Sequence, residues 1–87
     1  MNDEPFAKAL GAVLRHERQR AGHEQADFGK VLGITASGYS RVETGVTKIT
    51  VVQLRKLSRV LKIEAWKMVE EAERLTALGA KSSGAKR

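Results

Sequence analysis

The chain has 87 residues, a formal net charge of +6 and 41% hydrophobic residues, enough for one small domain with a modest core and too little for a second. It contains no cysteine, which excludes disulfides and thiolate metal sites and suits a reducing cytoplasm. No apolar run is long enough for a transmembrane helix or a secretory signal, so we expect a soluble cytoplasmic protein that does not associate with a membrane.

The charge is unevenly distributed. Residues 1–63 carry eleven Lys or Arg and six Asp or Glu, residues 64–78 carry two and four, and residues 79–87 carry three and none. The positive charge therefore lies on the first two thirds of the chain and on the C-terminal tail. A basic surface attracts any polyanion, so charge alone favours DNA, RNA and acidic lipid about equally.

The first predicted helix covers about residues 5–21, because acidic residues followed by Pro5 are typical of a helix start. Its apolar residues recur at helical spacing and are expected to close the core: Phe6, Leu10, Val13, Leu14 and Ala21. Gly22 ends this helix. Glu24 then stands where Ser or Thr would cap the next helix better, so that helix has a weak start.

The stretch from Gln25 to Gly45 predicts two short helices joined by a tight turn. Phe28 and Leu32 lie one helical turn apart, and so, roughly, do Tyr39 and Val42, which makes each half amphipathic. Between them Gly33 suits a left-handed backbone, and Thr35 can cap the second helix. Each helix is too short to be stable alone, so both depend on the rest of the fold.

Thr50 and Gln53 form a capping box that places the start of the next helix at Val51. Its expected core face consists of Val51, Leu54, Leu57, Val60 and Leu61. A further amphipathic helix begins at about Glu64 and keeps its spacing to about Leu78. We therefore expect one domain over residues 1–78 and a flexible basic tail over residues 79–87.

The last helix is long for so small a domain and needs a surface to pack on. One possibility is the first helix; the other is the same helix of a second copy of the chain. We expect a homodimer, with Trp66, Val69 and Leu75 in the interface.

His16 and His23 are seven residues apart, about 10 Å along a helix, which is too far for a shared metal ion. We therefore expect both side chains to be structural or solvated, with no metal and no cofactor. No nucleophile, acid and base occur at a usable spacing, so we do not expect an enzyme.

The chain from about residue 10 to residue 69 resembles the lambda-repressor-like, Xre-type family of helix-turn-helix DNA-binding proteins. The resemblance is carried by Leu14, Arg15, Arg18, Gly22, Gln25, Leu32, Gly33, Ile34, Thr35, Ser40, Arg41, Glu43 and Gly45. It implies an all-α fold of five helices in which the second and third form the helix-turn-helix. It also implies an ion pair between Arg18 and Glu43; the alternative from the residues alone is two solvated surface charges.

The resemblance further implies a double-stranded DNA partner, with the second helix of the motif in the major groove. The base-facing candidates are then Ala36, Ser37 and Arg41. The candidates for the DNA backbone are Gln25, Thr35, Ser40, Thr44 and Lys48. Arg41 is the strongest of the base readers, because its planar fork matches the O6 and N7 acceptors of guanine.

Gly38 departs from the family pattern, since a glycine inside the recognition helix costs about 1 kcal/mol relative to alanine. It indicates a close approach of the backbone to DNA, a pliable helix, or a neutral substitution. We expect a sequence-specific transcriptional regulator, a repressor that binds a palindromic operator as a dimer. The alternative is a protein-interaction module, antitoxin-like or coactivator-like, that binds a protein partner through its last helix.

Overall fold

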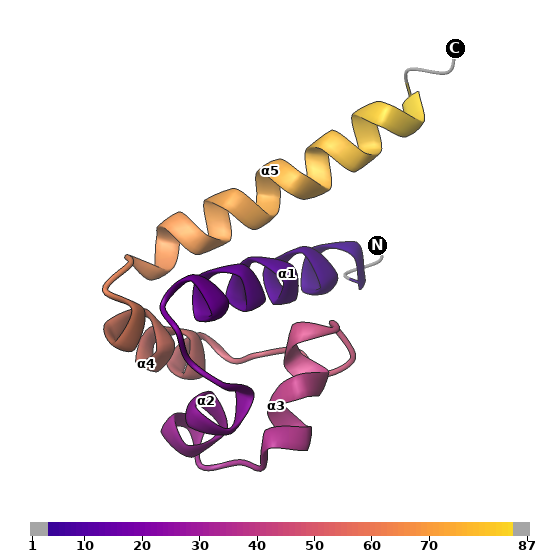
Figure 1. Ribbon diagram of the computed structural model, residues 1–87. Coiled ribbons are helices and arrows are strands. Elements are labelled where there is room, and N and C mark those ends of the chain that lie inside the picture. Colours follow the sequence, from indigo (N-terminus) through magenta and orange to yellow (C-terminus); the bar gives the residue numbers. More distant parts are fainter. Residues whose placement is uncertain (1–3, 85–87) are drawn as a thin grey trace.

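The computed structural model describes residues 4–84, and the side chains of residues 4–78. Five α-helices and no strand occur in this part of the chain, so the all-α class is confirmed. The helices are α1 (Glu4–Arg20), α2 (Gln25–Leu32), α3 (Ala36–Glu43), α4 (Val51–Leu61) and α5 (Ala65–Gly84). Figure 1 shows α1 in the centre, with α5 on one side and the α2–α3 pair on the other.

Every helix contributes one large side chain to the centre of the core. The largest fully buried side chains are Leu14 from α1, Phe28 from α2, Tyr39 from α3, Leu57 from α4 and Met68 from α5. The rings of Phe28 and Tyr39 meet edge to face, with their centroids 5.5 Å apart. The short helices α2 and α3 are therefore held by tertiary packing, as their length requires.

Three residues that we placed on core faces are exposed: Ala21, Val51 and Val60. Ala21 lies after the last residue of α1, where no neighbouring helix covers it. Val51 is 81% exposed because it occupies the first position of α4, whose buried residues are Leu54, Leu57 and Leu61. The periodicity gave the correct face of α4, but it does not reveal how far the neighbouring helices extend along that face.

The start of α4 follows the predicted capping chemistry, and the start of α2 departs from it. Thr50 and Gln53 form both hydrogen bonds of a capping box, at 3.0 and 2.9 Å, and α4 begins at Val51 as predicted. At the start of α2 the backbone N–H of Glu24 donates to the carboxylate of Asp27 at 2.8 Å. Asp27 thus supplies a hydrogen bond at a start that the sequence indicated to be weak.

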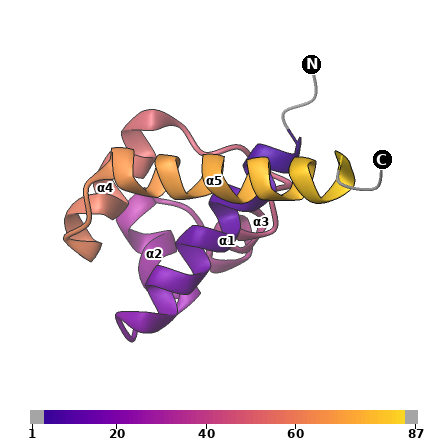
Figure 2. The same cartoon turned by 90° about the horizontal axis from the view of Figure 1, so that it is seen from above.

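Helix α5 packs on α1 through its first half, where Met68 and Ala72 are buried and Val69 is partly buried. The C-terminal end of α5 extends beyond the other helices (Figure 2). The helix continues to Gly84, past the boundary that we predicted at residue 78, and residues 85–87 of the predicted tail lie outside the described part of the chain. None of the helices described has both the length and the apolar content needed to cross a bilayer.

Candidate nucleic-acid interface

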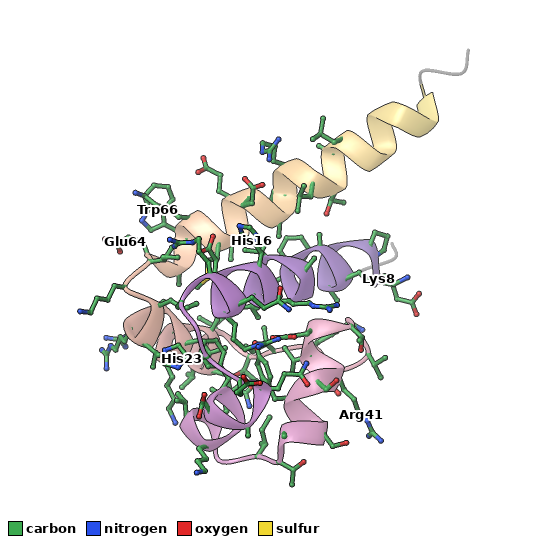
Figure 3. All side chains as sticks on the ribbon, in the orientation of Figure 1. Lys8, His16, His23, Arg41, Glu64 and Trp66 are labelled. Atoms are coloured by element: carbon green, nitrogen blue, oxygen red, sulfur yellow. The ribbon has the colours of Figure 1, made fainter. Side chains whose placement is uncertain are left out.

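Helix α3 has one buried face and one face open to solvent. Tyr39, Val42 and Glu43 are buried against the rest of the domain. Three residues predicted to face bases, Ala36, Ser37 and Arg41, are all exposed. Figure 3 shows the Arg41 side chain pointing away from the molecule. The outer face of α3 is therefore free to meet a large partner.

The turn before α3 sets the direction of this helix. Gly33 adopts a left-handed backbone with φ of 72°, which a side chain would disfavour. The next N–H, of Ile34, donates to the carbonyl of Gly29 at 2.8 Å. Thr35 then caps α3, since its hydroxyl oxygen accepts a hydrogen bond from the N–H of Gly38 at 2.9 Å.

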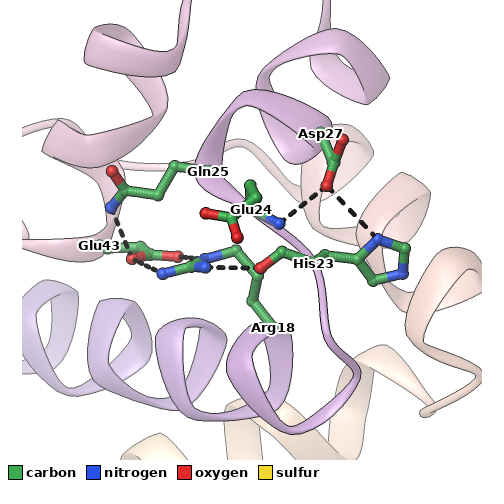
Figure 4. Close-up of polar contacts among 6 residues, drawn as sticks. All are labelled: Arg18, His23, Glu24, Gln25, Asp27 and Glu43. Carbon is green, nitrogen blue, oxygen red and sulfur yellow. Dashed lines mark hydrogen bonds and ion pairs between the residues drawn. The ribbon is translucent and has the colours of Figure 1, made fainter.

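A buried ion pair holds the C-terminal end of α3 (Figure 4). The guanidinium of Arg18 donates to both carboxylate oxygens of Glu43, from Nε at 2.6 Å and from Nη2 at 3.1 Å. Their side chains are only 7% and 2% exposed, so this is not a solvated surface pair. Arg18 also donates from Nη1 to the carbonyl of His23 at 2.7 Å. One side chain of α1 thereby connects α3 to the segment that leads into α2.

Gln25 joins the same network and links the first residue of α2 to α3. Its Nε2 donates to Oε1 of Glu43 at 2.9 Å (Figure 4). Burial raises the pKa of Glu43, but the hydrogen bonds from Arg18 and Gln25 outweigh burial, so the pKa of Glu43 lies below its usual value. The hydrogen bond to Glu43 raises the pKa of Arg18 further. Both members of the pair are therefore charged at neutral pH.

The hydroxyl of Tyr39 is buried beside this network and has no hydrogen bond of its own. Burial, followed by the nearby negative charge of Glu43, raises the pKa of Tyr39 well above its ordinary value. Tyr39 therefore stays neutral, and its ring serves the core.

Two of the residues predicted to contact the DNA backbone keep a hydrogen-bond donor available. The oxygen of Thr35 is used as an acceptor by the helix cap, which leaves its hydroxyl proton free to donate to a phosphate. Gln25 uses one amide hydrogen on Glu43, and its second one is free. Because the cap and the network already orient both groups, little side-chain freedom would be lost on binding.

The other three residues predicted to contact the DNA backbone differ in whether their donor groups are available. Lys48 is exposed, and no ion pair involves it within residues 4–78. Ser40 is half-buried. The hydroxyl of Thr44 donates to the carbonyl of Arg41 at 3.2 Å, so it must rotate before it can donate to a phosphate.

The structure shows which atoms a side chain at position 38 would meet first. A Cβ atom built there would lie 3.2 Å from Oγ1 of Thr35 and 3.8 Å from Cβ of Ile34. A side chain at this position would therefore point at the turn that starts α3 and crowd the capping hydroxyl. The absence of a side chain at Gly38 therefore leaves room for the cap of α3.

Gly11 has a role that the sequence analysis missed. A Cβ atom at Gly11 would lie 2.3 Å from the carbonyl oxygen of Glu43 and 2.6 Å from that of Val42. Helix α1 thus meets the last carbonyls of α3 backbone to backbone, where only glycine fits. The available signal was a glycine between core residues Leu10 and Val13 in an otherwise regular helix.

The two histidines lie apart from the outer face of α3. The ring of His23 packs at 5.5 Å from that of Phe28, and its Nδ1 lies 3.8 Å from the carboxylate of Asp27. His16 is exposed on α1. Within residues 4–84 no three His, Cys, Asp or Glu side chains are close enough together to hold a metal ion.

The chain matches a known protein family. A family model described as a helix-turn-helix domain matches residues 9–65, about two thirds of the chain. This range contains α2, α3 and α4 in full, most of α1 and the first residue of α5. No curated protein matches the chain.

Proposed function

We propose that this chain, which belongs to the helix-turn-helix domain family, is a sequence-specific transcriptional regulator of the lambda-repressor-like, Xre type. The observation that carries the proposal is the outer face of α3, which exposes Arg41 with Ala36 and Ser37 while the ion pair of Arg18 and Glu43 holds the opposite face. In such motifs the second helix enters the major groove and its first residues meet base edges.

The roles of the side chains follow from their chemistry. Arg41 presents a guanidinium fork to guanine, Ser37 hydrogen-bonds to any base edge, and Ala36 contacts a thymine methyl group. Gln25 and Thr35 donate to phosphates beside the N-termini of α2 and α3, where free N–H groups add positive potential. Lys48, Ser40 and Thr44 complete the backbone contacts. With one long base-reading side chain, DNA shape contributes much of the specificity.

The regulator would act in the cytoplasm as a dimer on a palindromic operator, with half-sites about 34 Å apart, one turn of DNA. Repression by exclusion of the polymerase from a promoter is the simplest mechanism for such a small domain. It requires DNA binding and no catalysis.

The Arg41→Ala variant is expected to lose preference at one base position of each half-site. Removal of a bidentate contact to guanine costs about 1–3 kcal/mol of discrimination against the other bases. The preferred site would first be selected from random duplexes with the wild-type protein. Competition gel shifts with all four bases at each position then give the preference. Arg59→Ala is a matched control, because Arg59 is exposed on α4, away from the face of α3.

Salt dependence tests the DNA proposal as a whole. Each phosphate contact by a cation releases counterions, so affinity must fall as the salt concentration rises. Affinity that is independent of salt, or a selection that yields no preferred sequence, would contradict the proposal. Equal effects of Arg41→Ala and Arg59→Ala would contradict the assignment of Arg41 to base contact.

The dimer proposal is supported by an exposed tryptophan on α5. Trp66 is 59% exposed and points away from α1 (Figure 3). Leu75 is 36% exposed but lies on the opposite side of α5, where it lines a groove with Ala12 and Val13 of α1, so a second copy would have to reach into that groove to contact it. Val69 is partly buried against the core, so only its remaining surface is available to a second copy. An exposed tryptophan is a common anchor of protein interfaces.

The Trp66→Ala variant is expected to shift the chain towards monomer at concentrations where the wild type is dimeric. It should also weaken binding to two half-sites more than binding to one. Analytical ultracentrifugation and gel shifts on one-site and two-site duplexes measure the two effects. Val52→Ala is the control, because Val52 is 65% exposed on α4.

The same exposed tryptophan supports a second candidate function, a protein-interaction module that binds a different protein through α5. If Trp66→Ala changes neither oligomeric state nor operator binding, the dimer interface is contradicted. A purified partner that binds the wild type and not Trp66→Ala would then favour the second candidate.

A further inference from the structure

An apolar pocket opens between the first half of α1 and the segment that follows α3. Its walls are formed mainly by Phe6, Leu10, Leu14, Val42 and Ile49, and its volume is about 180 Å³. Leu14 and Val42 also belong to the core, so the pocket reaches the interior of the domain. Thr47 and Lys48 line it from the loop between α3 and α4.

The size and chemistry of the pocket define what it can hold. A cavity of about 150 Å³ lined by aliphatic and aromatic side chains binds benzene, so this volume suits one ring or a short branched chain. The lining includes one cationic residue, Lys48, for which no ion pair occurs among the described side chains. A ligand with an apolar body and one negative charge would satisfy both features.

We propose that this pocket binds a small apolar carboxylate, with the ring or chain against Leu10, Leu14 and Ile49 and the carboxylate on the ammonium of Lys48. A neutral ligand of the same shape would contact the apolar walls of the pocket but would not form an ion pair with Lys48. A ring with one carboxylate, roughly nine non-hydrogen atoms, fits this volume, and affinities for so few atoms lie near 1 mM.

The position of Lys48 couples this site to DNA, a consequence that rests on the proposed function. Lys48 is a candidate phosphate contact, and one ammonium group cannot fully neutralise a phosphate while it pairs with a carboxylate. A bound carboxylate would therefore weaken DNA binding and lower the slope of log affinity against log salt by about 1 for each Lys48, or about 2 for the proposed dimer. Such a ligand would act as an inducer.

The direct test titrates benzoate and its neutral counterpart, benzyl alcohol, into the isotopically labelled full chain without DNA. Amide shifts read out binding, and saturable shifts are expected in residues 6–14 and 42–49 for both compounds. Lys48→Gln should weaken the binding of benzoate about two- to fivefold, as expected for the loss of an exposed ion pair, and leave the binding of benzyl alcohol unchanged. Lys56→Gln removes the same charge from an exposed site on α4 and should change neither.

Ala7→Leu provides an independent test of the location. Ala7 lines the pocket and is half-buried, so a larger side chain fills the volume without removing any core residue. It should abolish binding of both compounds, and a thermal melt would show whether the variant stays folded. Ala12→Leu adds the same bulk to the exposed, α5-facing side of the same helix, outside this pocket, and should leave the binding of both compounds unchanged. If Ala7→Leu does not fold, the comparison of Lys48→Gln with Lys56→Gln still decides the site.

The outcomes separate the pocket from its consequence for DNA. Absence of saturable shifts, shifts outside the pocket, or equal effects of Lys48→Gln and Lys56→Gln would overturn the site. Saturable binding with an unchanged salt slope on DNA would overturn the coupling. If the unliganded protein binds no DNA, the proposed function fails, while the titration without DNA still decides the pocket.

Discussion

Replacement of Glu43 by Gln is expected to reduce the free energy of unfolding by about 3 kcal/mol or more, because it leaves the buried Arg18 without its counter-charge. The loss should be large because Arg18 is 6% exposed and cannot turn into solvent without leaving the interior. The amide oxygen that this change introduces could still accept one hydrogen bond, so the charge rather than the shape is what changes. Urea unfolding followed by circular dichroism measures the difference.

Glu17→Gln is the matched control for this experiment. It removes the same charge from the pair of Glu17 with Arg20, whose side chains are 20% and 62% exposed. An exposed pair of this kind contributes about 0.2–1 kcal/mol, so its loss should be several-fold smaller. If the two variants lose the same stability, the ion pair of Arg18 and Glu43 does not support the fold as argued.

The pH dependence of stability gives a second readout of Glu43. Its folded-state pKa is lowered, so its contribution is fully present above its unfolded pKa of about 4.3 and is lost as pH falls through the folded value. The wild type should therefore lose stability as the pH falls below about 4.3, the unfolded pKa. The Glu43→Gln variant should lose less stability over the same pH interval. Parallel profiles of stability against pH for the two proteins would contradict the assignment of this pH dependence to Glu43.

Gly11→Ala is the second change with a large expected effect, a loss of about 3 kcal/mol of stability from overpacking. The added carbon would lie 2.3 Å from the carbonyl of Glu43, which is backbone and cannot swing aside. Helices α1 and α3 would have to separate. The movement would also disturb the Arg18 and Glu43 pair, which bridges the same two helices. Urea unfolding of the purified variant measures the loss.

Helix propensity predicts the opposite sign for this variant, which makes the test decisive. Alanine is favoured over glycine by about 1 kcal/mol in a helix, so propensity alone would stabilise Gly11→Ala. Ala12→Gly is the control, because Ala12 is the exposed next residue and should lose only that propensity. A stabilised Gly11→Ala would show that the two helices are not in close contact at this point.

Helix caps and turns could be predicted from the sequence wherever they depend on only a few neighbouring residues. Thr35 capping α3 and the Thr50 and Gln53 pair starting α4 depend on residues at most three positions apart. The left-handed Gly33 belongs to the same class. The Arg18 and Glu43 pair is 25 residues apart in the chain, and only the resemblance to a known family pointed to it.

What the sequence by itself determined is the all-α class, the helix starts, the buried faces of the helices and the position of the helix-turn-helix, because periodicity and capping are properties of short segments. Only the tertiary structure decided that Gly11 touches α3, that Val51 is exposed, that α5 packs on α1 by its first half and that a pocket lies beside Lys48. Each of these depends on which helices meet and at what distance, and that is set by the packing of residues far apart in the chain.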